Sequence, residues 1–183
     1  MSFEKFTGKK ASNILQKEAW SLLTKHGIKP KDLKAVVTVA GPGFYTGLRL
    51  SEGLADVFKF FQIPHYSFYT YDIPSLVGIE SGVWMTKAYR GEFFFHRWDK
   101  SSKHNDLLTT KDFAPYASKI SEVYIHSEAA VDDVIREHLP NRLTTFDLLK
   151  DNSQKIFSTV MDSKQVEESF YFRAPEDEFK VNP

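Results

Sequence analysis

Two segments near the start of the chain carry apolar residues at helical spacing. The first predicts a helix over residues 12–26, with Ser12 as its N-cap and Gly27 at its end. The second predicts a helix that opens with Leu48-Arg49-Leu50 and ends near Phe61. The expected buried stripes are Leu15, Ala19, Leu22 and Leu23 on the first helix, and Leu50, Leu54, Val57, Phe58 and Phe61 on the second.

A short β-branched run lies between these two helices. Residues 35–40 are apolar or β-branched throughout, which is typical of a parallel strand that is buried on both faces. Residues 65–69, which follow Pro64, predict another strand. The order of strand, glycine turn, helix and strand predicts a βαβ unit.

The second half of the chain has a different pattern. Two strand-like runs, residues 83–88 and 92–98, are separated by Tyr89-Arg90-Gly91, which predicts a hairpin. Further expectations are a strand at 123–126, a helix at 132–139 and an acidic, irregular stretch at 163–182. We therefore expect an α/β fold of two small lobes with mixed sheets, residues 1–79 with the glycine loop and two helices, and residues 80–183 with the hairpin and the acidic tail.

Composition narrows the function classes. The chain has 183 residues, with 24 basic and 24 acidic side chains, so its formal net charge is zero. Strong direct binding of nucleic acid is not expected, because the domain responsible usually has a pI above about 9. The lack of cysteine excludes disulfides and thiolate metal sites. Met1 to Lys10 is polar and basic rather than a signal peptide, and no run approaches a membrane span, so we expect a cytoplasmic protein without membrane contact.

The glycine-rich segment is the central motif. Its residues are Gly41-Pro42-Gly43-Phe44-Tyr45-Thr46-Gly47, placed between a predicted strand and a predicted helix. Backbone N–H groups at a helix start can hold an anion, but the spacing departs from both the Walker loop and the dinucleotide fingerprint. The alternative is a turn that lets another part of the backbone approach closely. On the residues alone, a packing turn is favoured over an anion site.

Candidate catalytic and metal groups are sparse. The six histidines never stand at the i, i+4 spacing of a helical zinc site, so we expect no metal and no cofactor. His96 alternates with Phe94 and Trp98 and is expected to be packed beneath aromatic rings. The adjacent Asp132 and Asp133 would point apart on a helix and favour its N-terminus. The sequence therefore favours a protein that is not itself an enzyme.

Two aromatic residues fall outside the buried stripes. Trp20 lies off the stripe of the first helix, and Phe60 is displaced in the same way on the second. Such residues, together with Gly53, are candidates for a partner-facing patch. Cover by a neighbouring loop is the equally weighted alternative. Basic residues interleave with aromatics at Lys59-Phe60-Phe61, where core packing is favoured over the stacking of nucleic-acid bases.

Three segments carry a family resemblance. Gly41 to Arg49 resembles the Gly-Pro-Gly-Ser-Phe-Thr-Gly-Leu-Arg signature of the TsaB (YeaZ) family, with its Gly41, Pro42, Gly43, Thr46, Gly47 and Arg49 matching. Lys87 to Phe93 resembles the family's Asp-Ala-Arg-Arg-Gly-Glu-Val hairpin through Arg90, Gly91 and Glu92, with Lys87 in the place of the aspartate. Phe170 to Arg173 resembles the closing Tyr-Leu-Arg.

The resemblance implies an actin-like (ribonuclease H-like) fold and an accessory role. TsaB supports the catalytic subunit TsaD in the threonylcarbamoylation of the tRNA adenosine next to the anticodon, and TsaE also joins. The contact helices would be those at Ser12–His26 and Leu48–Phe61. Family members begin with a hairpin for which this sequence shows no counterpart, so a shortened N-terminal lobe is expected. Two replacements further weaken the case for nucleotide binding: Phe44-Tyr45 stands in the place of the family's Ser-Phe, and Ser51 in the place of a glycine.

Three functions follow as hypotheses. The first is a TsaB-like scaffold that binds a TsaD-like partner, or forms a homodimer through the same two helices when alone. The second is a small nucleotide- or phosphate-binding protein that uses the loop from Gly41 to Gly47. The third is a degenerate paralogue that only associates with itself.

Overall fold

The computed structural model describes residues 11–88, 91–117, 120, 122–126, 133–139 and 141–172. The chain divides into two compact units: unit 1 is Met1–Tyr69 with Val160–Pro183, and unit 2 is Thr70–Thr159. The sequence placed a boundary near residue 79, whereas these units divide at residue 69 and again at residue 159. Both units mix helices with strands, so the α/β class is confirmed. In the described part of the chain, no helix is long and apolar enough to cross a membrane.

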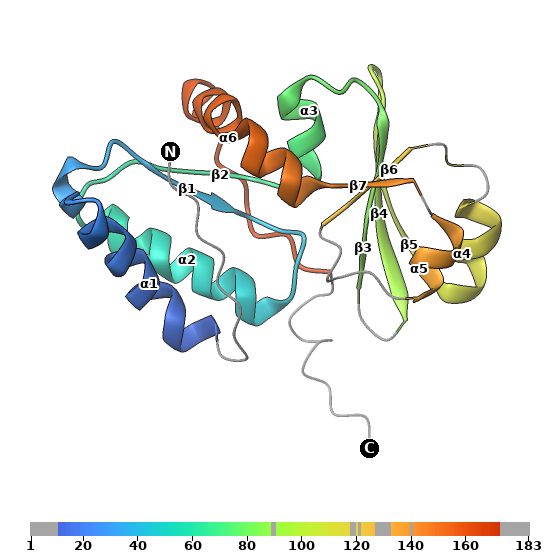
Figure 1. Ribbon diagram of the computed structural model, residues 1–183, viewed down its shortest axis with the longest axis horizontal. Coiled ribbons are helices and arrows are strands. Elements are labelled where there is room, and N and C mark those ends of the chain that lie inside the picture. Colours follow the sequence, from blue (N-terminus) through green and yellow to red (C-terminus); the bar gives the residue numbers. More distant parts are fainter. Residues whose placement is uncertain are drawn as a thin grey trace. The chain divides into compact units, whose positions relative to one another are not determined.

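Unit 1 contains the predicted βαβ unit (Figure 1). Its strands β1 (Val36–Val39) and β2 (His65–Phe68) pair in parallel, with Val36 opposite His65 and Val39 opposite Phe68. Helix α2 (Tyr45–Phe60) connects them, and α1 (Ala11–Lys25) precedes the short helix η1 (Pro30–Asp32) and β1. Gly27 follows α1 with a φ of +65°, which is the left-handed conformation expected after a helix C-terminus.

Three local expectations in unit 1 were wrong. Ser12 lies inside α1 and not in front of it. All four residues of β1 are only half-buried, and not buried on both faces as expected. Phe61 follows the last residue of α2 and is 54% exposed, so it does not belong to the buried stripe.

Unit 2 is built on a five-stranded sheet with the order β5-β4-β3-β6-β7. Strand β4 is antiparallel to both of its neighbours, β3 and β5, and β6 and β7 continue the sheet in parallel with β3. The predicted hairpin strands and the strand at 123–126 are thereby confirmed. The elements are η2 (Thr70–Asp72), α3 (Ile73–Val77), β3 (Gly82–Lys87), β4 (Glu92–Trp98), β5 (Lys103–Thr109), α4 (Thr110–Ala117), β6 (Val123–Ile125), α5 (Asp133–His138), β7 (Arg142–Thr144) and α6 (Thr145–Asp162).

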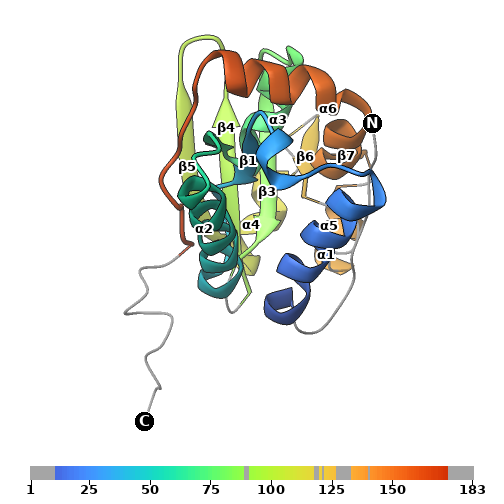
Figure 2. The same cartoon turned by 90° about the vertical axis from the view of Figure 1, so that its left-hand side faces the viewer.

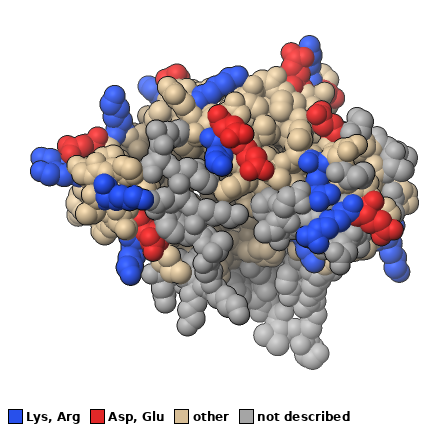
Figure 3. Space-filling view, in the orientation of Figure 1, with Lys and Arg blue, Asp and Glu red and all other residues tan. Residues whose placement is uncertain are grey.

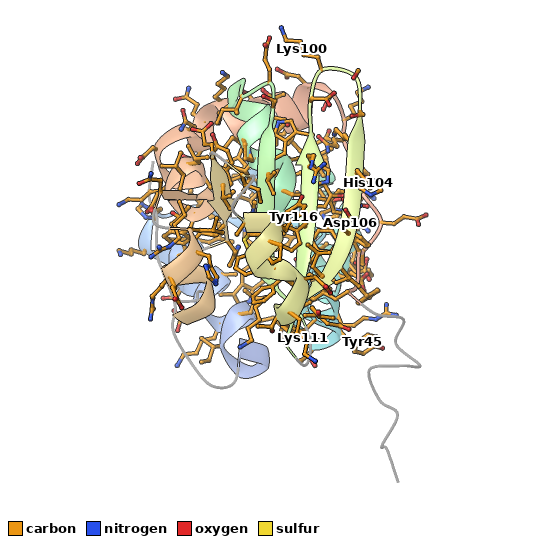
Figure 4. The ribbon with its side chains drawn as sticks, turned by 90° about the vertical axis from the view of Figure 1, so that its right-hand side faces the viewer. Tyr45, Lys100, His104, Asp106, Lys111 and Tyr116 are labelled. Carbon is orange, nitrogen blue, oxygen red and sulfur yellow. The ribbon has the colours of Figure 1, made fainter. Side chains whose placement is uncertain are left out.

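Aromatic side chains fill both faces of this sheet. One face is covered by α4, the helix on which Tyr116 is labelled in Figure 4. On this face the ring of Phe113 packs on Phe93 and Phe95 at centroid distances of 4.9 and 6.0 Å. On the other face, Tyr71 packs on Trp84 and Phe94. Alternation along β4 therefore sends its odd-numbered and even-numbered rings into two different layers of the core.

His96 is buried among aromatic rings, as the sequence predicts. The imidazole is 3% exposed and is stacked on Tyr71 at 3.9 Å and 13°, with Trp98 at 5.9 Å. Its Nδ1 donates to Oδ1 of Asn105 over 2.7 Å. Burial lowers the pKa of His96 below its ordinary value, despite the opposing effect of this hydrogen bond.

We expect His96 to make the stability of unit 2 depend on pH. Because its pKa is lowered in the folded state, the unfolded chain takes up the proton first, near the ordinary histidine pKa of about 6.5. Stability is therefore fully present above that pH and falls as the pH drops toward the folded pKa, by up to about 1.4 kcal/mol per pH unit. Urea unfolding at several pH values should show a flatter slope for His96→Gln. Equal slopes would contradict this, and His104→Gln, at an exposed histidine of β5, controls for the loss of one imidazole.

Candidate functional site

The glycine loop of unit 1 receives a segment that is distant in sequence. Gly41 has a φ of +118°, and a Cβ placed on it would lie 2.5 Å from the carbonyl oxygen of Phe170. The N–H of Gly43 donates to that same oxygen over 3.1 Å, and the N–H of Phe170 donates to Ala40 O over 2.8 Å. The loop therefore needs glycine at position 41 because another backbone occupies the space of a side chain.

Residues 165–172, which we call the closing segment, run along unit 1 in an extended conformation. Three aromatic pairs fix its end to the loop and to the residue after β2: Tyr69 with Phe170, Tyr45 with Tyr171, and Phe44 with Phe172. Upstream, the N–H of Ser67 donates to Gln165 O over 2.9 Å, and the Ser67 hydroxyl bonds to the backbone of Glu167. In the described chain the loop thus contacts protein, as the packing-turn hypothesis predicts.

Helix α2 begins three residues earlier than expected. Tyr45 is its first residue, so Thr46 and Gly47 lie in the first turn and not in the loop. Arg49 pairs with Glu52 at 2.9 Å and lies over the ring of Tyr45 at 5.2 Å. The neighbouring Tyr45 and Glu52 raise the pKa of Arg49. The sequence missed this start because it contains no capping serine, threonine or aspartate at Phe44.

The second motif lies in unit 2, whereas the glycine loop lies in unit 1. Lys87 is the exposed last residue of β3, and Glu92 is the first residue of β4. Gly91 has a φ of +79°, and its carbonyl accepts a hydrogen bond from the hydroxyl of Thr110 over 2.8 Å. Arg90 lies outside the described residues. For the described part of this motif, the contacts are those of a hairpin turn.

An open apolar groove of about 520 Å³ lies between α1 and α2. Trp20 is 44% exposed, and its ring meets Phe58 edge-on at a centroid distance of 5.9 Å. Trp20 is therefore partly covered by α2 and partly exposed. This lies between the two alternatives from the sequence, a partner-facing residue and a residue covered by a neighbouring loop. The lining residues are Gln16, Lys17, Ala19, Trp20, Leu54, Val57 and Phe58. The sequence placed Leu54 and Val57 in a buried stripe, whereas the structure makes them walls of this groove.

The other two patch candidates do not line the groove. Gly53 is exposed on α2, and a Cβ placed on it would meet no atom within 4 Å. Phe60 is 83% exposed and packs edge-on against Phe61 at 5.6 Å. Both share a face of α2 with Val57, from which they lie four and three residues away. The core-packing interpretation of Lys59-Phe60-Phe61 is thus wrong for both rings.

A second, polar cavity of about 390 Å³ lies under α2, against the strands and the closing segment. On its floor the hydroxyl of Thr38 is 2.8 Å from Nε2 of His65, and burial lowers the pKa of that histidine. The lysine and arginine at its rim are paired within α2, as Lys59–Asp56 and Arg49–Glu52. Among the described residues, no group of three histidine, aspartate or glutamate side chains could hold a metal ion.

Comparison with known proteins decides the fold. The sequence matches no family model and no curated protein. In contrast, the structure of YeaZ from Pseudomonas aeruginosa superimposes with a TM-score of 0.60, covering 89% of this chain and 84% of that one. This chain has the YeaZ fold. A second structure, of an uncharacterized protein with similarity to peptidase YEAZ from Pseudomonas aeruginosa, gives a TM-score of 0.58 over 86% of this chain and 79% of its own.

The sequence identities are 17% and 16%, so the YeaZ likeness is one of fold. It confirms, at that level, the resemblance that the motif from Gly41 to Arg49 indicated. The five-stranded sheet of unit 2 is mixed, and the two described strands of unit 1 are parallel. What the chain binds has to be argued from its own surface.

Proposed function

We propose that this chain is a TsaB-like accessory subunit that docks on a TsaD-like catalytic protein through α1 and α2. In this role it would support the threonylcarbamoylation of the tRNA adenosine next to the anticodon, and the partner would perform the chemistry. The observation that carries the proposal is the open apolar groove between the two helices, with Trp20 half-exposed on its wall. The YeaZ fold and the loop motif support membership of the same family.

The groove has the properties of a docking site for a helix. An apolar groove between neighbouring helices is a common seat for an amphipathic helix, whose anchors enter at i, i+3 and i+4 spacing. Tryptophan contributes strongly to interfaces, because a large ring with few rotatable bonds loses little entropy on binding. Gly53 adds a place where a partner helix could approach the backbone of α2 closely, since no described atom fills the space of its missing side chain.

Truncation of Trp20 tests the docking surface. Co-purification with the TsaD-like protein of the same organism, followed by size-exclusion chromatography, should give a complex with the wild type. Trp20→Ala is expected to weaken it by about 2 kcal/mol or more, roughly thirtyfold in Kd, as for other central aromatic anchors. Leu107→Ala in unit 2 is the matched control, because Leu107 is 48% exposed and Trp20 44%.

Gly53→Arg provides a second, steric variant. A Cβ at this exposed position meets no atom within 4 Å, so the fold should be retained while the approach of a partner is blocked. Absence of a complex with the wild type, or equal affinity of all variants, would refute the proposal. A homodimer that Trp20→Ala dissociates, without any TsaD-like complex, would favour the self-associating paralogue. Restoration of the tRNA modification in a strain that lacks its own TsaB, with or without a TsaE-like ATPase, separates these two outcomes.

A further inference from the structure

The apolar surface of the groove continues beyond it to the end of α2. Val57 lines the groove, and Phe60 follows it at i+3 on the same face of α2. Phe61, the residue directly after the helix, contacts the ring of Phe60 at 5.6 Å. The two phenylalanines are 83% and 54% exposed. Exposed rings in a continuous strip are unusual for a surface that faces only water. The strip therefore runs from Trp20 to Phe60.

The two helices end at the same end of unit 1. Trp20 lies five residues before the last residue of α1 and contacts Phe58, which lies two residues before the last residue of α2. Figures 1 and 2 show α1 and α2 running in the same direction, with both C-terminal ends at the end that is on the left in Figure 1 and faces the viewer in Figure 2. The exposed phenylalanines and the turn after α1 are thus parts of one surface.

Lysine side chains gather on this surface. Lys25 ends α1, Lys29, Lys31 and Lys34 follow it before β1, and Lys59 lies beside Phe60. The acidic residues among them are Asp32, which accepts a hydrogen bond from the N–H of Lys29, and Asp56, which pairs with Lys59. Figure 3 shows basic side chains projecting from this end of unit 1. A chain with zero net charge therefore has a locally positive end.

We infer that this end of unit 1, the lysine-rimmed aromatic end, receives an amphipathic helix whose polar flank is acidic. The inference rests on the proposed function, because it describes the chemistry of the partner that docks on α1 and α2. A leucine-rich stripe would cover the strip from Trp20 to Phe60, and carboxylates beside it would face Lys29, Lys31 and Lys34. A continuous strip along a helix fits a second helix better than a nucleic acid, which needs separate rings for stacking.

The lysines would act mainly on specificity and on the rate of association. Opposite charges around an interface steer the encounter, and salt screens them over about 10 Å at moderate ionic strength. The aromatic strip would instead set the rate of dissociation, because it supplies the buried contact. Charge reversal and ring truncation should therefore change different rate constants.

Two designed amphipathic helical peptides test the inference. They have equal length and the same leucine stripe, and their flanks carry glutamate in one and lysine in the other. Biolayer interferometry with the full chain should show the acidic peptide binding at least about tenfold more tightly at low salt, with the difference shrinking as salt is raised. Phe60→Ser combined with Phe61→Ser should speed dissociation, and the exposure of both rings leaves the fold intact.

Charge reversal provides the matched pair of variants. Both triple variants change the net charge equally: the first reverses Lys29, Lys31 and Lys34, and the second reverses the exposed Lys100, Lys111 and Lys150 of unit 2. The first triple variant, Lys29→Glu with Lys31→Glu and Lys34→Glu, should lower the association rate constant of the acidic peptide about tenfold. The unit 2 variant should change that rate constant by less than about twofold. Equal binding of the two peptides, or equal effects of the two triple variants, would overturn the inference.

Two further outcomes are decisive. Tighter binding of a single-stranded oligouridine than of the acidic peptide would overturn the inference in favour of nucleic acid. If the TsaD-like protein forms a complex but the acidic peptide does not bind, the inference fails and the proposed function stands. If the peptide binds at the lysine-rimmed aromatic end but no TsaD-like complex forms, the inference stands and the proposed function fails.

Discussion

Gly41→Ala is expected to lower the free energy of unfolding of unit 1 by about 3 kcal/mol, because two costs combine at this position. A φ of +118° is strained for any residue with a side chain. The added methyl group would also lie 2.5 Å from the carbonyl oxygen of Phe170, a backbone atom that can move only if the closing segment moves. The closing segment should therefore detach from the loop.

Gly47→Ala is the matched control within the same motif. Gly47 lies in the first turn of α2, and a Cβ there meets no atom within 4 Å. Alanine should stabilise the helix there by up to about 1 kcal/mol. Urea unfolding measures both variants, and hydrogen exchange at the amides of Gly43 and Phe170 reports on detachment. Equal stability of the two alanine variants would contradict the close approach at Gly41.

Trp84→Ala is expected to remove about 3–5 kcal/mol from the stability of unit 2, which is the cost of truncating a fully buried large aromatic residue. Trp84 is 1% exposed, its ring meets Tyr71 and Phe94 at about 6 Å, and its Nε1 donates to the Thr145 hydroxyl over 3.3 Å. The variant loses the ring contacts and leaves a cavity in the core. A domain with ordinary stability would then be largely unfolded at 37 °C.

Trp84→Phe is a milder variant that tests the same packing if Trp84→Ala fails to fold. It keeps an aromatic ring in the same place and should cost roughly half as much, so it remains measurable if the alanine variant does not fold. Trp20→Ala is the exposed counterpart and should cost about 1 kcal/mol or less, because the indole is 44% exposed. Thermal unfolding followed by circular dichroism checks all three. A Trp84→Ala variant as stable as Trp20→Ala would contradict the layered core of unit 2.

The periodic part of the fold could be predicted from the sequence, and its polar elements could not. The βαβ unit and the strands β3 and β4 have strong apolar patterns. Strand β5 is Lys-His-Asn-Asp followed by Leu-Leu-Thr, so its first half has no apolar face in the sequence. Helix α6 was missed although Ile156 and Val160, both fully buried, lie at helical spacing in it. Both strand β7 and helix α4 were missed as well, because they are short.

Two local signals could have located the missing elements. Asp99 accepts hydrogen bonds from the N–H groups and hydroxyls of Ser101 and Ser102, which lower its pKa to about 2, and this turn joins β4 to β5. Before α6, the hydroxyl of Thr144 donates to Asp147 and accepts from its N–H over 3.0 Å. The bond from the Asp147 N–H to the Thr144 hydroxyl is that of an N-cap residue, and the Thr-x-x-Asp spacing that makes it was readable in the sequence.

The sequence indicated individual residues of the candidate site, but not which distant segments come together there. The glycine loop, Trp20 and Phe60 were all singled out from local patterns. The closing segment falls in the stretch that was expected to be acidic and irregular. Its contacts join residues about a hundred positions apart, as in the hydrogen bond from Tyr69 to Glu168 over 3.0 Å. Periodicity carries no information on such pairs. The groove was missed for the same reason, since Leu54 and Val57 are apolar whether a core or a partner covers them.

The closing segment has a consequence for the synthesis of the protein. Unit 2 is continuous in sequence, from Thr70 to Thr159, and can complete its core while the ribosome is still translating. Unit 1 begins first but needs residues 165–172 for the contacts at the glycine loop. Of the two units, the one that emerges earlier is therefore finished later. A premature stop codon after Thr159 would spare the whole of unit 2 and leave the glycine loop of unit 1 without its closing segment.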